Sequence, residues 1–433
     1  MIITNSLGSN YTTKDRISAL KLLFQPWKWR DGPETEQLKD TILNIIPGRI
    51  ASFQIELFLK GRHAIFEALR KLGIGHNDEV IVQAFTCVAV VQPILDLEAT
   101  PIYIDVDSKN LNPSFEKIKK AVTPKTKAVI LQHTLGYINR ENDKIVEWCR
   151  SHKIFIIQDL AHAIGANTFN EDGPLLQQRT VLSMPDAIIL SFSQDKVIDG
   201  VSGGALVIPE NHVIPAPACI SYAESIAGRK AGTYLNRFPI RPGMTMWVII
   251  KLLLYPTITY LIRSTYNYKL GKLIHFCAKN LNLLPSPLEA PAEPTALPNI
   301  LAALALNQFK RFDKIISHRR NVALTYDRTL NQKFKLVTIN DINNSSNLRF
   351  PLWVENRDEL EKKLTNHSFY LMDHWYDAPV SPGWVDNSEV KYRPGSCPNA
   401  EELAKHIFNL PTHINISKKE AERLAKLVNE LMG

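Results

Sequence analysis

Two stretches decide the fold: Ile156-Ile-Gln-Asp-Leu-Ala-His-Ala-Ile-Gly165 and Leu190-Ser-Phe-Ser-Gln-Asp-Lys196. Each begins as an apolar strand and ends in polar residues, the first in Asp159 and the second in Lys196. A lysine at a strand end can form a Schiff base with an aldehyde, and a carboxylate can keep a pyridine nitrogen protonated. The pair indicates a pyridoxal phosphate site, although a loop lysine taken alone is usually only a solvated charge.

The order of elements around these stretches predicts the fold class. The expected strands are 79–82, 101–105, 128–132, 154–158, 187–192 and 204–208, and the expected helices are 62–72, 89–97, 113–121 and 142–152. Apolar strands that alternate with helices predict an α/β fold with a mostly parallel sheet covered on both faces. Ligands bind beyond the carboxyl ends of such strands, where Asp159, His133 and Lys196 all fall.

The length of 433 residues favours more than one domain. We expect an N-terminal lead-in over 1–50, a large cofactor-binding domain over 51–320 and a small C-terminal α+β domain over 321–433. A basic, apolar insertion over about 213–292 interrupts the large domain. One long helix is expected over 300–330, after a proline-rich stretch.

Composition excludes several classes of protein. Five scattered cysteines, none in a CxxC pair, argue against a disulfide framework or a zinc site, and therefore for the reducing cytoplasm. We expect no metal. The first residues lack the basic start and apolar run of a secretory signal. Nucleic-acid binding is not expected, because the basic residues lie among apolar ones and form no known binding motif.

Several stretches in a fixed order carry a family resemblance. They are Gly61–Leu69, Gly75–Thr86, Ala99–Asp107, Gln158–His162, Ser191–Lys196, 203–205 and Tyr392–Glu401. Together they resemble the DegT/DnrJ/EryC1/StrS family over about 35–210 and 295–433. The resemblance implies a fold-type I pyridoxal phosphate aminotransferase that moves an amino group from an amino acid to a keto sugar, usually nucleotide-linked. It also implies a homodimer.

The resemblance assigns roles to six residues. Lys196 corresponds to the Schiff-base lysine, which then carries a proton between substrate and cofactor, and Asp159 to the partner of the pyridine nitrogen. His162 stands where the family contacts the ring, and Gly61 and Ser191 where it binds the phosphate. Arg62 replaces a small hydroxyl residue and can pair with the phosphate. Three of these residues have an alternative interpretation: Asp159 would cap a turn, His162 would be structural, and Arg62 would be a surface residue.

The chain departs from the family pattern at two places. The family stacks an aromatic residue on the cofactor after the Thr corresponding to Thr86, but here Cys87 follows, so either Cys87 or Phe85 fills that position. An Asn-Tyr-Arg element that reaches the partner's cofactor is replaced by 294–298, Pro-Thr-Ala-Leu-Pro. His374, Trp375 and Tyr376 lie where the small domain of the family closes over substrate. They could contact a sugar or base, or they could be core residues without such a role.

Three functions are compatible with these residues. The first is the sugar aminotransferase just described. The second is a different pyridoxal phosphate reaction on a non-sugar substrate, because none of the named residues defines the acceptor. The third is a non-catalytic protein at a membrane surface, against which the joint presence of Lys196, Asp159 and Ser191 argues.

The segment 225–287 holds nine Lys or Arg residues and no Asp or Glu. The whole chain has a net charge of +8, so the rest of the chain has a net charge of −1. It also contains Trp247, five tyrosines and an apolar stretch over 244–255, which Lys251 and Pro256 interrupt. Basic residues beside interfacial aromatics predict peripheral attachment to the inner face of a membrane. The alternative is a pair of helices that pack on the partner subunit.

Overall fold

The computed structural model describes residues 1–46, 53–107, 111–166, 185–210, 245–286, 288, 294–371 and 375–433. Its centre is a sheet of seven strands in the order β2-β9-β8-β7-β6-β3-β5. The strands are β2 Phe53–Phe58, β3 Glu79–Gln83, β5 Thr100–Ile104, β6 Thr126–Gln132, β7 Phe155–Asp159, β8 Ala187–Ser191 and β9 Gly204–Pro209. Strands β8, β7, β6, β3 and β5 run parallel, and β9 is antiparallel to both its neighbours. The predicted α/β class with a mostly parallel sheet is confirmed.

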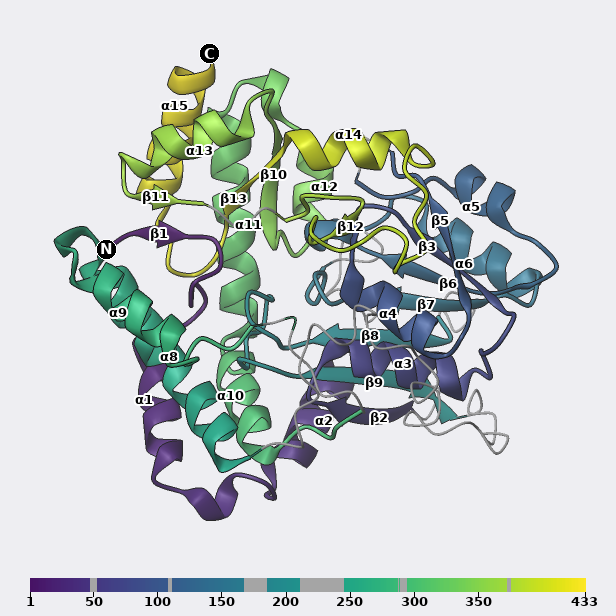
Figure 1. Cartoon of the computed structure of the whole chain (residues 1–433), viewed down its shortest axis with the longest axis horizontal. Helices are drawn as coiled ribbons and strands as arrows, with labels where there is room; N and C mark the ends of the chain where they lie inside the picture. The colour runs from purple at the N-terminus through teal and green to yellow at the C-terminus, as the bar shows by residue number, and fades with distance from the viewer. Residues whose placement is uncertain are drawn as a thin grey trace.

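Helices cover both faces of this sheet, as Figure 1 shows. Along β6, Ala128 and Ile130 pack with α3 Gly61–Lys71 and α4 Val88–Asp96, whereas Val129 and Leu131 pack with α5 Phe115–Ala121 and α6 Asn142–Ser151. Successive side chains on a strand point to opposite faces, so a strand buried on both sides is apolar throughout. The continuous apolar runs in the sequence have this cause.

The C-terminal part is built on the antiparallel pair β10 Arg349–Trp353 and β13 Ile407–Pro411. Its helices are α11 Phe312–Thr329, α12 Ile339–Asn343, α13 Arg357–Thr365, α14 Pro398–His406 and α15 Lys418–Met432. Two short parallel pairs tie it to the rest of the chain. β11 Phe369–Tyr370 pairs with β1 Ile3–Thr4, and β12 Val380–Ser381 pairs with β4 Thr86–Cys87. The first residues of the chain therefore pack against its C-terminal part.

The other α-helices of the described residues are α1 Thr13–Leu23, α2 Glu34–Ile45, α8 Met246–Thr265, α9 Leu270–Asn280 and α10 Asn299–Phe309. They pack against one another, and α2 packs on β2. The expected single helix over 300–330 is wrong, because α10 ends at Phe309 and α11 begins at Phe312. Arg311, between them, has a non-helical φ of −125° and pairs with Asp15 at 2.8 Å. This contact with the N-terminal segment fixes the bend.

Helix α8 also differs from the sequence-based expectation. It runs through both Lys251 and Pro256, and the side chains of both residues are buried. A proline inside a helix removes one backbone donor, a cost that packing of the buried face can outweigh. By length and composition, Met246–Tyr268 is the one helical stretch among the described residues that could cross a membrane, and half of it is buried in the protein.

Candidate active site

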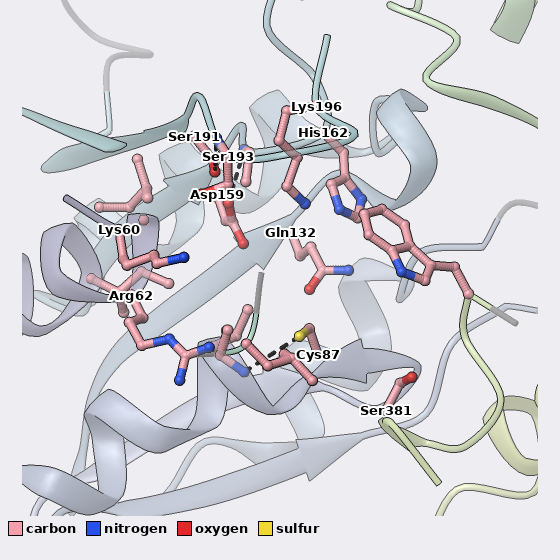
Figure 2. Close-up of a pocket in the computed structure, with 18 of the residues that line it drawn as sticks. Lys60, Arg62, Cys87, Gln132, Asp159, His162, Ser191, Ser193, Lys196 and Ser381 are labelled. Carbon is pink, nitrogen blue, oxygen red and sulfur yellow. Dashed lines mark hydrogen bonds between the residues drawn. The ribbon is translucent and has the colours of Figure 1, made fainter. Parts of the chain in front are cut away.

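A cavity of about 270 Å³ lies at the carboxyl ends of β6, β7 and β8, beside the first turn of α3. Nine residues predicted from the sequence line it: Gly61, Arg62, Cys87, Asp159, His162, Ser191, Lys196, Trp375 and Tyr376. His374, predicted with them, lies outside the described residues. Figure 2 shows Lys60 and Arg62 on one side of the cavity and Lys196 with His162 across from them. The structure thus brings together residues that are far apart in the sequence.

Lys196 lies in the turn that follows β8, with its amine above an aromatic ring. Its Nζ is 4.5 Å from the centroid of the Trp375 ring. Burial lowers the pKa of Lys196 to about 8, although Cys87, Asp159 and Asp195 act in the opposite direction. A neutral amine is a nucleophile and a proton acceptor, whereas an ammonium ion is neither. The environment therefore makes this lysine reactive near neutral pH.

Asp159, the last residue of β7, is 3% exposed. Burial raises the pKa of its carboxyl, while the Ala161 N–H, which donates to Oδ1 at 2.9 Å, and Lys196 act in the opposite direction. A buried carboxylate favours a cationic partner, because an unpaired charge in the protein interior is costly. A protonated pyridine nitrogen is such a partner.

His162 is held as a neutral imidazole. Its Nδ1 accepts the backbone N–H of Leu135 at 3.2 Å, so Nε2 carries the proton. Burial lowers the pKa of His162 well below its ordinary value, and Lys196 and Arg349 lower it further. The ring stacks on that of Trp375, with centroids 5.2 Å apart. His162 can therefore donate one hydrogen bond from Nε2.

One end of the cavity is formed by the start of α3 and the end of β8. Gly61 is the first residue of α3, and helix N-termini bind phosphate through free backbone N–H groups. Close packing makes this possible, since a Cβ on Gly204 of β9 would lie 2.6 Å from the Cα of Gly61. Ser191 lies beside Gly61 and contributes a hydroxyl.

Two cations reach the same end. Arg62 is only 8% exposed, so it is not a surface residue, and it donates to Gln92 Oε1 at 2.7 Å. Lys60, the residue before the helix, also lines the cavity. Helix dipole, hydroxyl and cations together suit a phosphate group.

Cys87 fills the position where the family has an aromatic residue. It lines the cavity, and its Sγ accepts the N–H of Ala89 at the start of α4. Phe85 is fully buried and packs edge-on against Tyr376, with centroids 5.2 Å apart. Of the two alternatives, Cys87 lines the cavity and Phe85 does not.

Trp375 and Tyr376 come from the C-terminal part and close the cavity. Tyr376 is buried, which raises the pKa of its hydroxyl well above the ordinary value, so it stays a neutral donor. β12 lies next to β4, which places Ser381 opposite Cys87. One wall of the cavity therefore belongs to the C-terminal part of the chain.

The turn that carries Lys196 is braced from the N-terminal segment. Asp199 accepts hydrogen bonds from the hydroxyl of Tyr11 and from the backbone N–H groups of Asp195 and Val201. Asn10 donates to the carbonyl of Lys196 at 2.9 Å. Burial raises the pKa of Asp199 to about 6, while these hydrogen bonds act in the opposite direction.

Some residues of the site carry no signal in the sequence. Six polar or charged residues that line the cavity were not predicted: Lys60, Gln132, Ser193, Gln194, Asp377 and Ser381. His133, expected at this edge, is fully buried, accepts the N–H of Asn139 and does not line the cavity. The alternation of side chains explains this, because the last residue of β6, Gln132, faces the cavity instead. Within the described residues, no group of His, Cys, Asp and Glu is arranged to hold a metal.

The chain matches a family model described as the DegT/DnrJ/EryC1/StrS aminotransferase family over residues 12–237 and 289–429. It is 25% identical over 378 residues to GDP-perosamine synthase of Escherichia coli O157:H7, which covers 86% of this chain and 83% of that enzyme. It is 35% identical over 148 residues to the UDP-N-acetyl-3-dehydro-alpha-D-glucosamine 3-aminotransferase of Acidithiobacillus ferrooxidans, or 34% of this chain and 38% of that one.

Among solved structures, the aminotransferase TlmJ from Streptoalloteichus hindustanus superposes with a TM-score of 0.67. The two share 18% sequence identity, and the superposition covers 100% of this chain and 99% of that one. At that identity the likeness shows a common fold.

Proposed function

This chain belongs to the DegT/DnrJ/EryC1/StrS aminotransferase family, and we propose that it transfers an amino group from an amino acid to a nucleotide-linked keto sugar. The observation that carries the proposal is the convergence of Lys196, Asp159 and His162 on one cavity, beside an anion site. A non-catalytic protein would have no need of a lysine with a depressed pKa opposite a buried acid.

The cavity residues fit pyridoxal phosphate, the cofactor of the family. Gly61, Ser191, Lys60 and Arg62 would hold its phosphate, and Asp159 its ring nitrogen. When bound, the cofactor supplies an electron sink for the carbon that bears the amine. The protein has to position the ring and move protons.

Lys196 and His162 would perform the remaining steps. Because the pKa of Lys196 is lowered to about 8, its amine would be able to carry a proton between the substrate carbon and the cofactor. The Nε2–H of His162 would donate to the phenolic oxygen of the ring. Trp375, stacked on His162, shields these groups from water on the side of the C-terminal part.

The choice of a keto sugar is supported by the relatives. The names of two of them specify a GDP-linked and a UDP-linked sugar. In this chain, Trp375 and Tyr376 line the cavity and provide aromatic side chains of the kind that pack on sugars and bases.

A two-stage assay tests the proposal. The purified enzyme is first mixed with L-glutamate or L-glutamine, and loss of the visible cofactor absorbance shows which of the two donates an amine. GDP- or UDP-linked keto sugars are then added, and amino-sugar formation is followed by mass spectrometry. We expect return of the absorbance together with an amino sugar, and neither with Lys196→Ala. Turnover of a simple keto acid but of no nucleotide sugar would favour the second function, on a non-sugar substrate.

We also infer a homodimer, as the family resemblance implies. The Pro-Thr-Ala-Leu-Pro stretch over 294–298 lacks the residues through which the family reaches its partner's cofactor. Lys60 and Arg62 place two cations at that end of the cavity within one chain. Light scattering should give the mass of a dimer, and a fully active monomer would contradict this inference.

A further inference from the structure

Helices α8 and α9 present an apolar surface that nothing in the described structure covers. Eight of the fifteen exposed large hydrophobic side chains of the described residues lie between Met246 and Leu281. Those on α9 or just after its end are Leu270 at 51%, Leu273 at 58%, Phe276 at 65% and Leu281 at 64%. We call this surface, together with Met246, Trp247 and Leu261, the α8–α9 face. Such clustering marks an interaction site, because isolated apolar residues scatter over a normal surface.

The opposite side of the helical pair is anchored to the protein. Leu252, Leu253 and Tyr255 of α8 are buried in the cluster that includes α1 and α10. Arg263 donates to the carbonyl of Gly8 at 2.9 Å, and α9 approaches α8 so closely that a Cβ on Gly271 would lie 2.3 Å from the carbonyl oxygen of Ile262. Figure 1 shows α1, α8 and α9 together at one edge of the molecule. The pair therefore lies along the protein, and only its outer side is available to a partner.

Charge on this surface has one sign. Residues 245–286 contain five Lys or Arg and no Asp or Glu, and Lys269, Lys272 and Lys279 are all exposed. With 3.6 residues per turn, Leu273 and Phe276 fall in the middle of the outer side of α9. Lys272 and Lys279 fall along one border of it. An apolar strip bordered by lysines is the pattern of a helix that lies in a membrane interface.

A second copy of the chain is a poorer partner for this surface. In a twofold interface the same patch faces itself, so the three lysines would face three lysines. No acidic residue of 245–286 is available to neutralise them. On a lipid surface, by contrast, the lysine stems extend to anionic headgroups while the leucines enter the acyl region.

We propose that the α8–α9 face binds the surface of a membrane that contains anionic lipids. The helix pair lies in the plane of the interface, with Leu273 and Phe276 inserted and Lys272 and Lys279 at the headgroups. The proposal is independent of the reaction, because binding involves no residue of the cavity. It holds the enzyme at a membrane whichever substrate it uses.

Flotation of the full-length enzyme with vesicles, without any substrate, tests this. One set of vesicles is phosphatidylcholine alone, and the other contains phosphatidylglycerol as well, both at low salt. We expect binding to the second set only. The double variant Lys272→Glu/Lys279→Glu should bind at least about 25-fold more weakly, because each lysine near an anionic surface contributes about fivefold. Leu273→Ser/Phe276→Ser should lose at least about tenfold.

Matched controls keep the result specific. Lys119→Glu/Lys120→Glu on α5 makes the same change of charge elsewhere, and Leu43→Ser/Ile339→Ser removes two exposed apolar groups elsewhere. Both should bind like the unaltered enzyme, and thermal melting shows that all variants are folded. Equal binding to both vesicle sets, or equal losses in controls and test variants, would overturn the proposal. So would vesicle-free light scattering in which only the α8–α9 variants dissociate an oligomer, since the face would then be a protein interface.

Discussion

At the scale of single residues, the amine of Lys196 has an environment that changes its chemistry. Burial lowers its pKa from the ordinary 10.5 to about 8, because the interior disfavours the charged form. Only the neutral amine adds to an aldehyde. Removing the cofactor and adding it back should therefore give a rate that rises about tenfold per pH unit below about pH 8 and then levels off. Stopped-flow absorbance measures this rate. A rate still rising at about pH 10 would show an ordinary lysine.

The role proposed for Asp159 requires a negative charge, which a neutral amide of the same shape lacks. Asp159→Asn should keep the visible cofactor absorbance but lower the turnover number by about a hundredfold or more, because an amide cannot keep the ring nitrogen protonated. Steady-state kinetics and the absorption spectrum are measured on the same sample. Near-normal turnover would mean that another group holds that nitrogen.

We expect Lys60, which lines the cavity, to contribute to binding of the cofactor's phosphate. Lys60→Ala should weaken binding of pyridoxal phosphate to the cofactor-free protein by about tenfold or more, the effect of one charge-assisted contact. Fluorescence titration measures the dissociation constant. Lys127→Ala, which removes an exposed lysine from the same sheet, is the control and should leave it unchanged. An unchanged dissociation constant in Lys60→Ala would mean that Gly61, Arg62 and Ser191 hold the phosphate without Lys60.

At the scale of elements, the turn after β8 depends on a hydrogen bond from outside the sheet. Tyr11→Phe removes the hydroxyl that donates to the buried Asp199. We expect a loss of about 1.5–3 kcal/mol in the free energy of unfolding, the value of a hydrogen bond to a charged group. Denaturant unfolding measures it. Tyr260→Phe on α8, where the ring lies under the Arg16 guanidinium, should be nearly neutral.

The pH dependence of that loss follows from Asp199. Its pKa in the folded protein is raised to about 6, above the ordinary 3.8, so its protonated form is favoured and its contribution to stability falls as the pH rises between these values. Above about pH 6 the hydroxyl stabilises a carboxylate, and below it a neutral acid. The deficit of Tyr11→Phe should therefore be larger above about pH 6 than below it, and a deficit independent of pH would exclude a charged Asp199.

At the scale of the whole molecule, the first eleven residues join parts of the chain that are distant in sequence. Thr4 accepts a bond that His413 can donate, Asn5 donates to the carbonyl of Asn409, and Asn10 bonds Arg319 and the Lys196 turn. Deleting residues 1–11 should lower the melting temperature by at least about 10 °C and abolish cofactor binding. Calorimetry and absorbance check this. Removing 431–433 at the other end should change little, and equal effects would indicate general fragility instead.

The sequence alone predicted the class of fold, which the structure confirms, and it named residues that the structure brings together in one cavity. A continuous apolar run such as that of β8 predicts a buried strand, because burial on both faces excludes polar residues. Asp159 and Lys196 could be picked out because parallel strands end at one edge of the sheet, where ligands bind.

Only the tertiary structure decided what depends on partners distant in sequence. The structure has two helices, α10 and α11, where one was expected, because Arg311 pairs with Asp15. Helix α8 continues through Pro256, because burial outweighs one lost hydrogen bond. The structure also showed that Gln132 rather than His133, and Cys87 rather than Phe85, lines the cavity. Which side chain faces a cavity depends on the register of a strand against its neighbours. The brace by Tyr11 was not visible beforehand, because a hydrogen bond between residues 11 and 199 leaves no periodic pattern in the chain.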